Sequence, residues 1–133
     1  GENMVKTVIV TNNPVCNKAF KDQFEIIYLK EGTYWDVLIK ARDLIYLNYD
    51  LLTHPLAGSV KPNQMPYRTI LLADKQDDKE KFYLDCKLIE NSMDSYQKFI
   101  KDRKLPDWSE KLLEDFQDVD YSLIEGVVTK MNT

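Results

Sequence analysis

The sequence predicts an α/β fold: a small, mainly parallel sheet of about four strands, flanked by helices and followed by a C-terminal helical segment. The first observation is that short β-branched or aliphatic runs alternate with helical patterns as far as residue 73. The second is that only helical periodicity follows residue 81. The third is size, since 133 residues with 44% hydrophobic content fit one domain with one core.

The first strand and the first helix are expected within residues 6–22. Residues 6–11 form a β-branched run that is typical of a buried strand. Asn13 suits an N-cap because its side chain can accept a hydrogen bond from a free helix amide. Pro14 suits the first helical position because no amide donor is needed there. The helix should bury Cys16, Ala19 and Phe20.

A second strand, a second helix and two further strands follow. Residues 24–29 have the pattern of a strand. Thr33 is a good N-cap, and Asp36, three residues later, stabilises the positive start of the helix. Strands are expected again at residues 51–53 and 69–73. The helix over residues 34–48 should bury side chains spaced three and four apart, namely Tyr34, Val37, Leu38, Ala41, Leu44 and Ile45.

The C-terminal half is expected to be helical and to pack on the sheet within one domain. Residues 75–81 form a charged, mobile link, and residues 82–104 form a long amphipathic helix. Residues 107–110 have the form of a capping box for the next helix, and Asp120 is expected to cap a last one. The expected buried faces are Phe82, Cys86, Ile89, Met93, Tyr96 and Ile100, then Leu112, Leu113 and Phe116, then Ile124, Val127, Val128 and Met131.

The order of these elements limits the topology of the sheet. Crossover connections between parallel strands are right-handed. The simplest arrangement therefore places the second and third strands on opposite sides of the first. The fourth strand can run antiparallel to the third or return parallel to it. In open α/β sheets ligands bind at the carboxyl ends of the strands, so the crevice is expected between the ends of the first and third strands.

Composition narrows the classes of function. The net charge is −4, and an acidic surface repels phosphate backbones, so nucleic acid is not an expected partner. No apolar stretch is long enough for a membrane span, and no signal peptide is visible, so a cytoplasmic protein is expected. Gly1 is expected to be a tag remnant and residues 1–4 a disordered start. Cys16 and Cys86 have no CxxC spacing and are expected to be free, small buried side chains, with a stabilised Cys16 thiolate as the alternative.

The segment between Leu51 and Ala73 contains no acidic residue, but it holds the only histidine and three of the five prolines. Prolines lower the entropy of the unfolded chain, so such a loop can hold a fixed shape. We hypothesise that it binds a small anionic metabolite, with Arg68 as the bidentate contact and Lys61 as a point charge. The expected ligand-binding residues are Asn12, Asn13, His54, Ser59, Lys61, Asn63, Tyr67 and Arg68.

Two alternatives remain open for this loop. It could be an Ω-loop that packs on itself, in which His54 bonds to backbone, or His54 could act as a general acid or base. Whether the protein is an enzyme therefore stays open. The loop lacks the spacing of a P-loop, no GxGxxG follows the first strand, and no metal motif is present. No cofactor is expected.

Three stretches of the sequence resemble the GrdX family: residues 11–14 (TNNP), residues 36–45, and residues 52–63 (LTHPLAGSVKPN). These are small proteins encoded with the glycine, sarcosine and betaine reductases of anaerobic bacteria. The resemblance implies an accessory protein of that system, with reductase components as partners. It does not identify catalytic residues in this chain. The alternative is a scaffold that docks a reductase subunit through the acidic half, since residues 74–133 hold 15 acidic and 10 basic residues.

Overall fold

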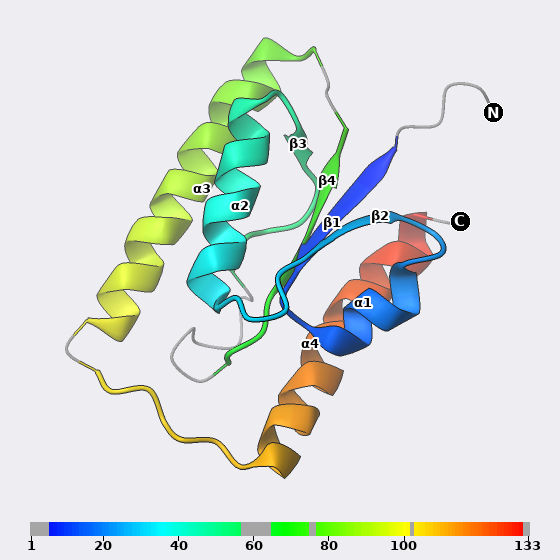
Figure 1. The fold of residues 1–133 in the computed structure, drawn as a ribbon. Helices are drawn as coiled ribbons and strands as arrows, with labels where there is room; N and C mark the ends of the chain where they lie inside the picture. The colour runs from blue at the N-terminus through cyan, green and yellow to red at the C-terminus, as the bar shows by residue number, and fades with distance from the viewer. Residues whose placement is uncertain (1–5, 57–64, 75–76, 102, 132–133) are drawn as a thin grey trace.

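The computed structural model describes residues 6–56, 65–74, 77–101 and 103–131 of the chain (Figure 1). Strands and helices alternate in the first half, and two long helices form most of the second half. The α/β class is therefore confirmed. In chain order the elements are β1 (Thr7–Thr11), α1 (Pro14–Phe20), β2 (Glu25–Tyr28), α2 (Tyr34–Tyr46), β3 (Asp50–Leu51), β4 (Thr69–Ala73), α3 (Lys79–Ile100) and α4 (Glu110–Met131).

The sheet is mixed, which corrects the prediction of a mainly parallel sheet. Its strand order is β2-β1-β4-β3. β1 pairs parallel with β2, whereas β4 pairs antiparallel with both β1 and β3. The third strand therefore does not lie beside the first, because β4 enters between them. The physical reason is burial: all five residues of β4 are buried, so β4 takes a central place, and the two-residue β3 is left at the edge.

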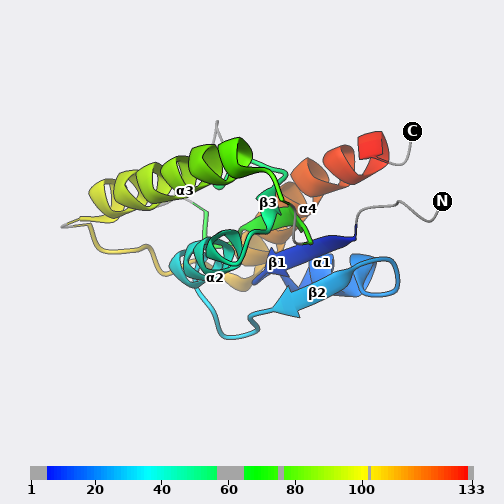
Figure 2. The same ribbon diagram turned by 90° about the horizontal axis from the view of Figure 1, so that it is seen from above.

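Helices cover both faces of the sheet, with α2 and α3 on one face and α1 and α4 on the other (Figures 1 and 2). The larger core lies under α2 and α3 and includes Val8 and Val10 of β1. The smaller core lies under α1 and α4 and includes Ile9. Successive side chains of a strand point to opposite faces. β1 is apolar on both faces for this reason.

The predicted starts of the first two helices are confirmed. Oδ1 of Asn13 accepts a hydrogen bond from the Val15 amide at 3.0 Å, and Pro14 is the first residue of α1. Thr33 and Asp36 form a reciprocal capping box, with bonds of 3.2 and 2.8 Å. The six side chains predicted to be buried by α2 are all buried. Local rules therefore place both helix starts at one end of the sheet.

The C-terminal helices differ from the prediction in their bounds. Asp78 caps α3 by accepting from the Lys81 amide at 3.1 Å, so residues 79–81 are helical and not part of a link. Residues 75 and 76 lie outside the described residues, as do residues 1–4. The helix α4 is continuous, and Ser109 lies at its start, accepting from the Leu112 amide at 3.2 Å.

Four predicted side-chain positions need correction. Asp120 is a buried residue inside α4 and not a cap, because its carboxylate faces polar partners on the sheet and on α1. Ala19 is exposed, since α1 ends one residue later and turns that side to solvent. On α4, Leu112 and Met131 are 39% and 44% exposed, although both were expected to be buried. Leu112 lies about 120° around the helix from its buried face, and Met131 is the last residue of the helix.

Side chains of α3 close the edge strand β3. The carboxylate of Asp85 accepts from the Leu51 amide at 2.9 Å, and Nζ of Lys81 donates to the Leu51 carbonyl at 2.8 Å. The same Nζ lies 2.6 Å from Oδ1 of Asp85. An open strand edge is a template for pairing with another chain. These bonds satisfy the backbone of Leu51 on that edge.

Among the described residues, no helix is long and apolar enough to cross a membrane.

Candidate functional site

Three segments that are distant in sequence meet at one end of the strands of the sheet. β1 and β3 run parallel to each other, and β4 runs against both. The residues that follow β1 and β3 therefore lie beside the residues that precede β4. Asn12, which is 4% exposed, joins two of these segments, since its Oδ1 accepts from the Arg68 amide at 2.9 Å. Its Nδ2 donates to the carbonyl of Pro66 at 2.9 Å and to that of Gly32 at 3.2 Å.

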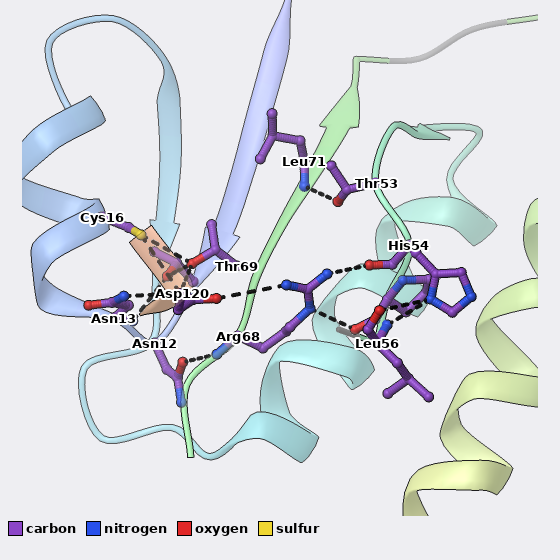
Figure 3. A network of polar contacts seen from close by, with 12 residues as sticks. Asn12, Asn13, Cys16, Thr53, His54, Leu56, Arg68, Thr69, Leu71 and Asp120 are labelled. Atoms are coloured by element: carbon purple, nitrogen blue, oxygen red, sulfur yellow. Dashed lines mark hydrogen bonds and ion pairs between the residues drawn. The ribbon is translucent and has the colours of Figure 1, made fainter. Parts of the chain in front are cut away.

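The guanidinium of Arg68 is buried and directed at protein partners (Figure 3). Nε donates to the Pro55 carbonyl at 2.9 Å, and Nη2 donates to the His54 carbonyl at 2.5 Å. Nη1 lies 3.8 Å from Oδ1 of Asp120. Arg68 thus fixes the segment after β3 against the start of β4. A bidentate contact from Arg68 to a ligand stays a prediction.

Asp120 of α4 is the centre of a buried polar cluster (Figure 3). It is 1% exposed. Its Oδ2 accepts from the Thr69 hydroxyl at 2.6 Å and from Nδ2 of Asn13 at 3.0 Å. The Thr11 and Thr69 hydroxyls are 2.6 Å apart, and Thr11 accepts from the Asn13 amide at 3.0 Å. A buried carboxylate needs such donors to offset the loss of its hydration, so the cluster holds α4 on the sheet.

Sequence reasoning missed the part that Asp120 plays in this site. A signal was present, because Asp120, Ile124 and Val128 are spaced by four residues. Positions four apart lie on the same face of a helix. An acidic residue in register with the apolar face predicts a buried carboxylate with partners.

The thiol of Cys16 borders the same cluster. Sγ lies 3.8 Å from Oδ2 of Asp120 and 3.3 Å from the Thr69 hydroxyl. Burial, followed by the negative charge of Asp120, raises the pKa of Cys16 to about 12. A thiolate is therefore disfavoured, and Cys16 is the small buried side chain that the sequence predicts. Cys16 and Cys86 are both free cysteines.

His54 is exposed, and both its ring and its carbonyl contact other parts of the chain. The ring nitrogen Nδ1 lies 3.0 Å from the Leu56 amide, which donates to it, and 3.0 Å from the Leu56 carbonyl. Arg68 binds the His54 carbonyl, as described above. These contacts match the backbone-bonding alternative for His54. The predicted ligand contacts Ser59, Lys61 and Asn63 lie outside the described residues.

A pocket of about 320 Å³ lies next to the buried cluster, at the ends of β1 and β2 and the start of α2. Two predicted site residues line it, Asn12 and Tyr67, whereas Asn13, His54 and Arg68 are not among its lining residues. The Tyr67 hydroxyl accepts from Nε2 of Gln117 at 2.8 Å, which connects the pocket to α4. The lining includes four aromatic residues, namely Tyr34, Tyr67, Tyr96 and Trp108. It also includes two exposed charged residues at its rim, Lys30 and Glu31.

Gly32 at the rim of this pocket is required by a close approach of the chain. A Cβ at this position would lie 2.7 Å from Cβ of Leu29 and 3.2 Å from the Leu29 carbonyl. The Gly32 carbonyl accepts from Asn12. The tight turn thereby brings the loop before α2 against the end of β1. Within the described ranges, no group of three or more His, Cys, Asp or Glu side chains could hold a metal ion.

These features define a small α/β protein with a mixed four-stranded sheet, a buried Asp–Arg cluster, and a pocket at the carboxyl ends of its two adjacent parallel strands. The chain belongs to the GrdX-like family, because the family model described as GrdX-like protein matches residues 8–129. The resemblance seen in the sequence is thereby confirmed. No curated protein and no solved structure matches the chain.

Proposed function

We propose that this GrdX-like protein is a cytoplasmic accessory protein of the glycine, sarcosine and betaine reductase system that binds a small metabolite. The observation that carries the proposal is the pocket of about 320 Å³ at the ends of β1 and β2. Small-molecule sites occupy about 300–1,000 Å³ and favour this end of α/β sheets. The link with the reductase components rests on membership of the family.

The residues around the pocket favour a ligand that carries both a carboxylate and a positive charge. Lys30 and the start of α2 favour the carboxylate. Glu31 has the opposite sign at the same rim, which disfavours a ligand with several negative charges, such as a phosphate ester. The aromatic walls suit the carbon skeleton of the ligand. A small amino-acid-like zwitterion therefore fits better than a phosphate.

Thermal-shift titration with glycine, sarcosine, betaine, acetate and acetyl phosphate tests this proposal. A ligand that binds the folded state stabilises it by about 2.7 kcal/mol at a concentration of 100 times its dissociation constant. The amino-acid-like ligands should raise the melting temperature more than acetyl phosphate does.

Variants locate the binding site. Lys30→Gln should reduce the shift, whereas Lys18→Gln on the exposed side of α1 should retain it. Trp108→Phe should change the dependence of the fluorescence on ligand concentration, because Trp108 lines the pocket. The absence of a shift with all five compounds would argue against the proposal.

A further inference from the structure

Aromatic side chains from four separate segments line the pocket of about 320 Å³. Tyr34 begins α2, Tyr67 precedes β4, Tyr96 belongs to α3, and Trp108 precedes α4. Tyr34 and Tyr96 are 2% and 4% exposed, whereas Tyr67 and Trp108 are half-buried. The last two therefore offer most of the aromatic surface that is available to a ligand.

The two half-buried rings are both held by α4. Trp108 meets Phe116 edge-on, with ring centroids 5.9 Å apart. The Tyr67 hydroxyl accepts from Gln117, the next residue of the helix, at 2.8 Å. A lining that is ordered before the ligand arrives lowers the entropic cost of binding.

Several polar groups of the lining are already bound within the protein. The side chains of Asn12, Thr33 and Tyr67 each accept a hydrogen bond from another part of the chain. The carbonyls of Gly32 and Pro66 both accept from Nδ2 of Asn12. A primary ammonium carries N–H donors that need acceptors, and burying them without acceptors costs free energy. A quaternary ammonium carries no such donor, so this lining suits it better.

The aromatic faces and the rim also favour a cation. The face of an aromatic ring attracts a cation within about 6 Å, most strongly where water is excluded. Quaternary ammonium groups are typical ligands of such aromatic sites. Glu31 adds a carboxylate at the rim, while Lys30 and the start of α2 suit a carboxylate on the ligand.

We infer that this pocket prefers a small carboxylate bearing a quaternary ammonium over the same carboxylate bearing a primary ammonium. The inference rests on the proposed function, because it names the ligand class for the same pocket. The methyl groups of the ligand would lie against Tyr67 and Trp108, and its carboxylate would lie toward Lys30. Tyr67 and Trp108 are therefore the residues expected to determine specificity.

Isothermal titration calorimetry of the full chain tests the inference with betaine, glycine and tert-butylacetate. Betaine and glycine share a carboxylate and differ in the methylation of the nitrogen. The ion tert-butylacetate has the shape of betaine, with a neutral carbon in place of the charged nitrogen. Betaine should bind at least about tenfold more tightly than either, because it alone combines a cation with methyl groups that need no acceptor.

Matched variants locate the contact. Tyr67→Phe and Tyr67→Leu both lose the bond to Gln117, and only the leucine variant loses the ring. The leucine variant should bind betaine at least about fivefold more weakly than the phenylalanine variant, with a smaller difference for tert-butylacetate. Trp108→Leu should weaken betaine binding in the same way. Tyr83→Leu, at a side chain that is 61% exposed on α3 and outside the pocket, should change it less than about twofold.

The outcomes separate the inference from the proposed function. Glycine or tert-butylacetate binding as tightly as betaine would overturn the inference and leave a metabolite site in place. Full betaine affinity in both Tyr67→Leu and Trp108→Leu would also overturn it. No binding of betaine or glycine would contradict both proposals. If Tyr67→Leu fails to fold, as judged by circular dichroism, Trp108→Leu decides the question, since Trp108 lies in the connection between α3 and α4.

Discussion

Replacing Asp120 by alanine removes the acceptor at the centre of the buried cluster. The hydroxyl of Thr69 and the amide of Asn13 then lose a partner at 2.6 and 3.0 Å. The guanidinium of Arg68, 5% exposed, loses the carboxylate 3.8 Å away. Its bonds to the carbonyls of Pro55 and His54 remain. The variant therefore leaves a buried cation without its counter-charge and two buried donors with one acceptor fewer, since Asn13 keeps the Gln117 carbonyl and the Thr69 hydroxyl keeps that of Thr11.

The expected cost follows from these contacts. Removing one partner of a buried ion pair costs about 3–5 kcal/mol, because the other charge stays buried. A hydrogen bond to a charged group contributes about 1.5–3 kcal/mol. These terms overlap, so we expect Asp120→Ala to lower the free energy of unfolding by about 3–5 kcal/mol. Small domains have about 5–15 kcal/mol in total. Asp120→Asn keeps the shape and one acceptor, and it should cost less.

Urea unfolding followed by circular dichroism measures this loss. The matched control is Asp118→Ala, an exposed carboxylate two residues earlier on the same helix, which should change the free energy of unfolding by less than about 0.5 kcal/mol. A loss below about 1 kcal/mol for Asp120→Ala, or an equal loss for both variants, would refute the view that this carboxylate holds α4 on the sheet.

Four further predictions concern other parts of the fold. Gly32→Ala should lower the melting temperature, because the new Cβ would lie 2.7 Å from that of Leu29. Overpacking of this kind costs about 1–3 kcal/mol. An unchanged melting temperature would contradict the close approach. Thr33→Ala removes a capping-box bond and should cost about 1 kcal/mol in urea unfolding. Cys16 should resist a thiol reagent at pH 8 until guanidinium is added, and a stoichiometry of two thiols in the native protein would contradict its burial. The pKa of Cys16 is raised from 9.0 to about 12 in the folded protein. Between about pH 9 and pH 12 the unfolded chain therefore loses this proton while the folded protein keeps it, so the free energy of unfolding should fall as the pH rises through this range. Cys16→Ala should remove this part of the pH dependence.

Local patterns predicted what local physics determines. The caps at Asn13 and Thr33 and the buried face of α2 follow from residues within one or two turns of each other. The place of β4 could not be predicted in the same way, because a sequence pattern does not record which strand pairs with which. The same limit applied to Arg68: its own segment contains no carboxylate, and its counter-charge comes from Asp120, far along the chain.

The candidate site was predicted in part. Neighbouring segments after β1 and β3 were expected from the rule that ligands lie at strand ends, and the bonds of Asn12 and Arg68 show that these segments meet. The pocket was not predicted, because its aromatic walls come from separate segments of the chain with no common motif. Tyr67 was singled out for its polarity, whereas its hydroxyl binds Gln117 and its side chain lines a wall.

Gln117 of α4 contacts both the pocket and the residue that caps α1. Its side chain donates to the hydroxyl of Tyr67, which lines the pocket, and its carbonyl accepts from Nδ2 of Asn13 at 2.9 Å. One turn of α4 is thus tied both to a pocket wall and to the start of α1. A metabolite that favours one position of Tyr67 also favours the matching position of α4. Thermodynamic reciprocity then requires any partner on α4 that prefers this position to tighten metabolite binding by the same factor.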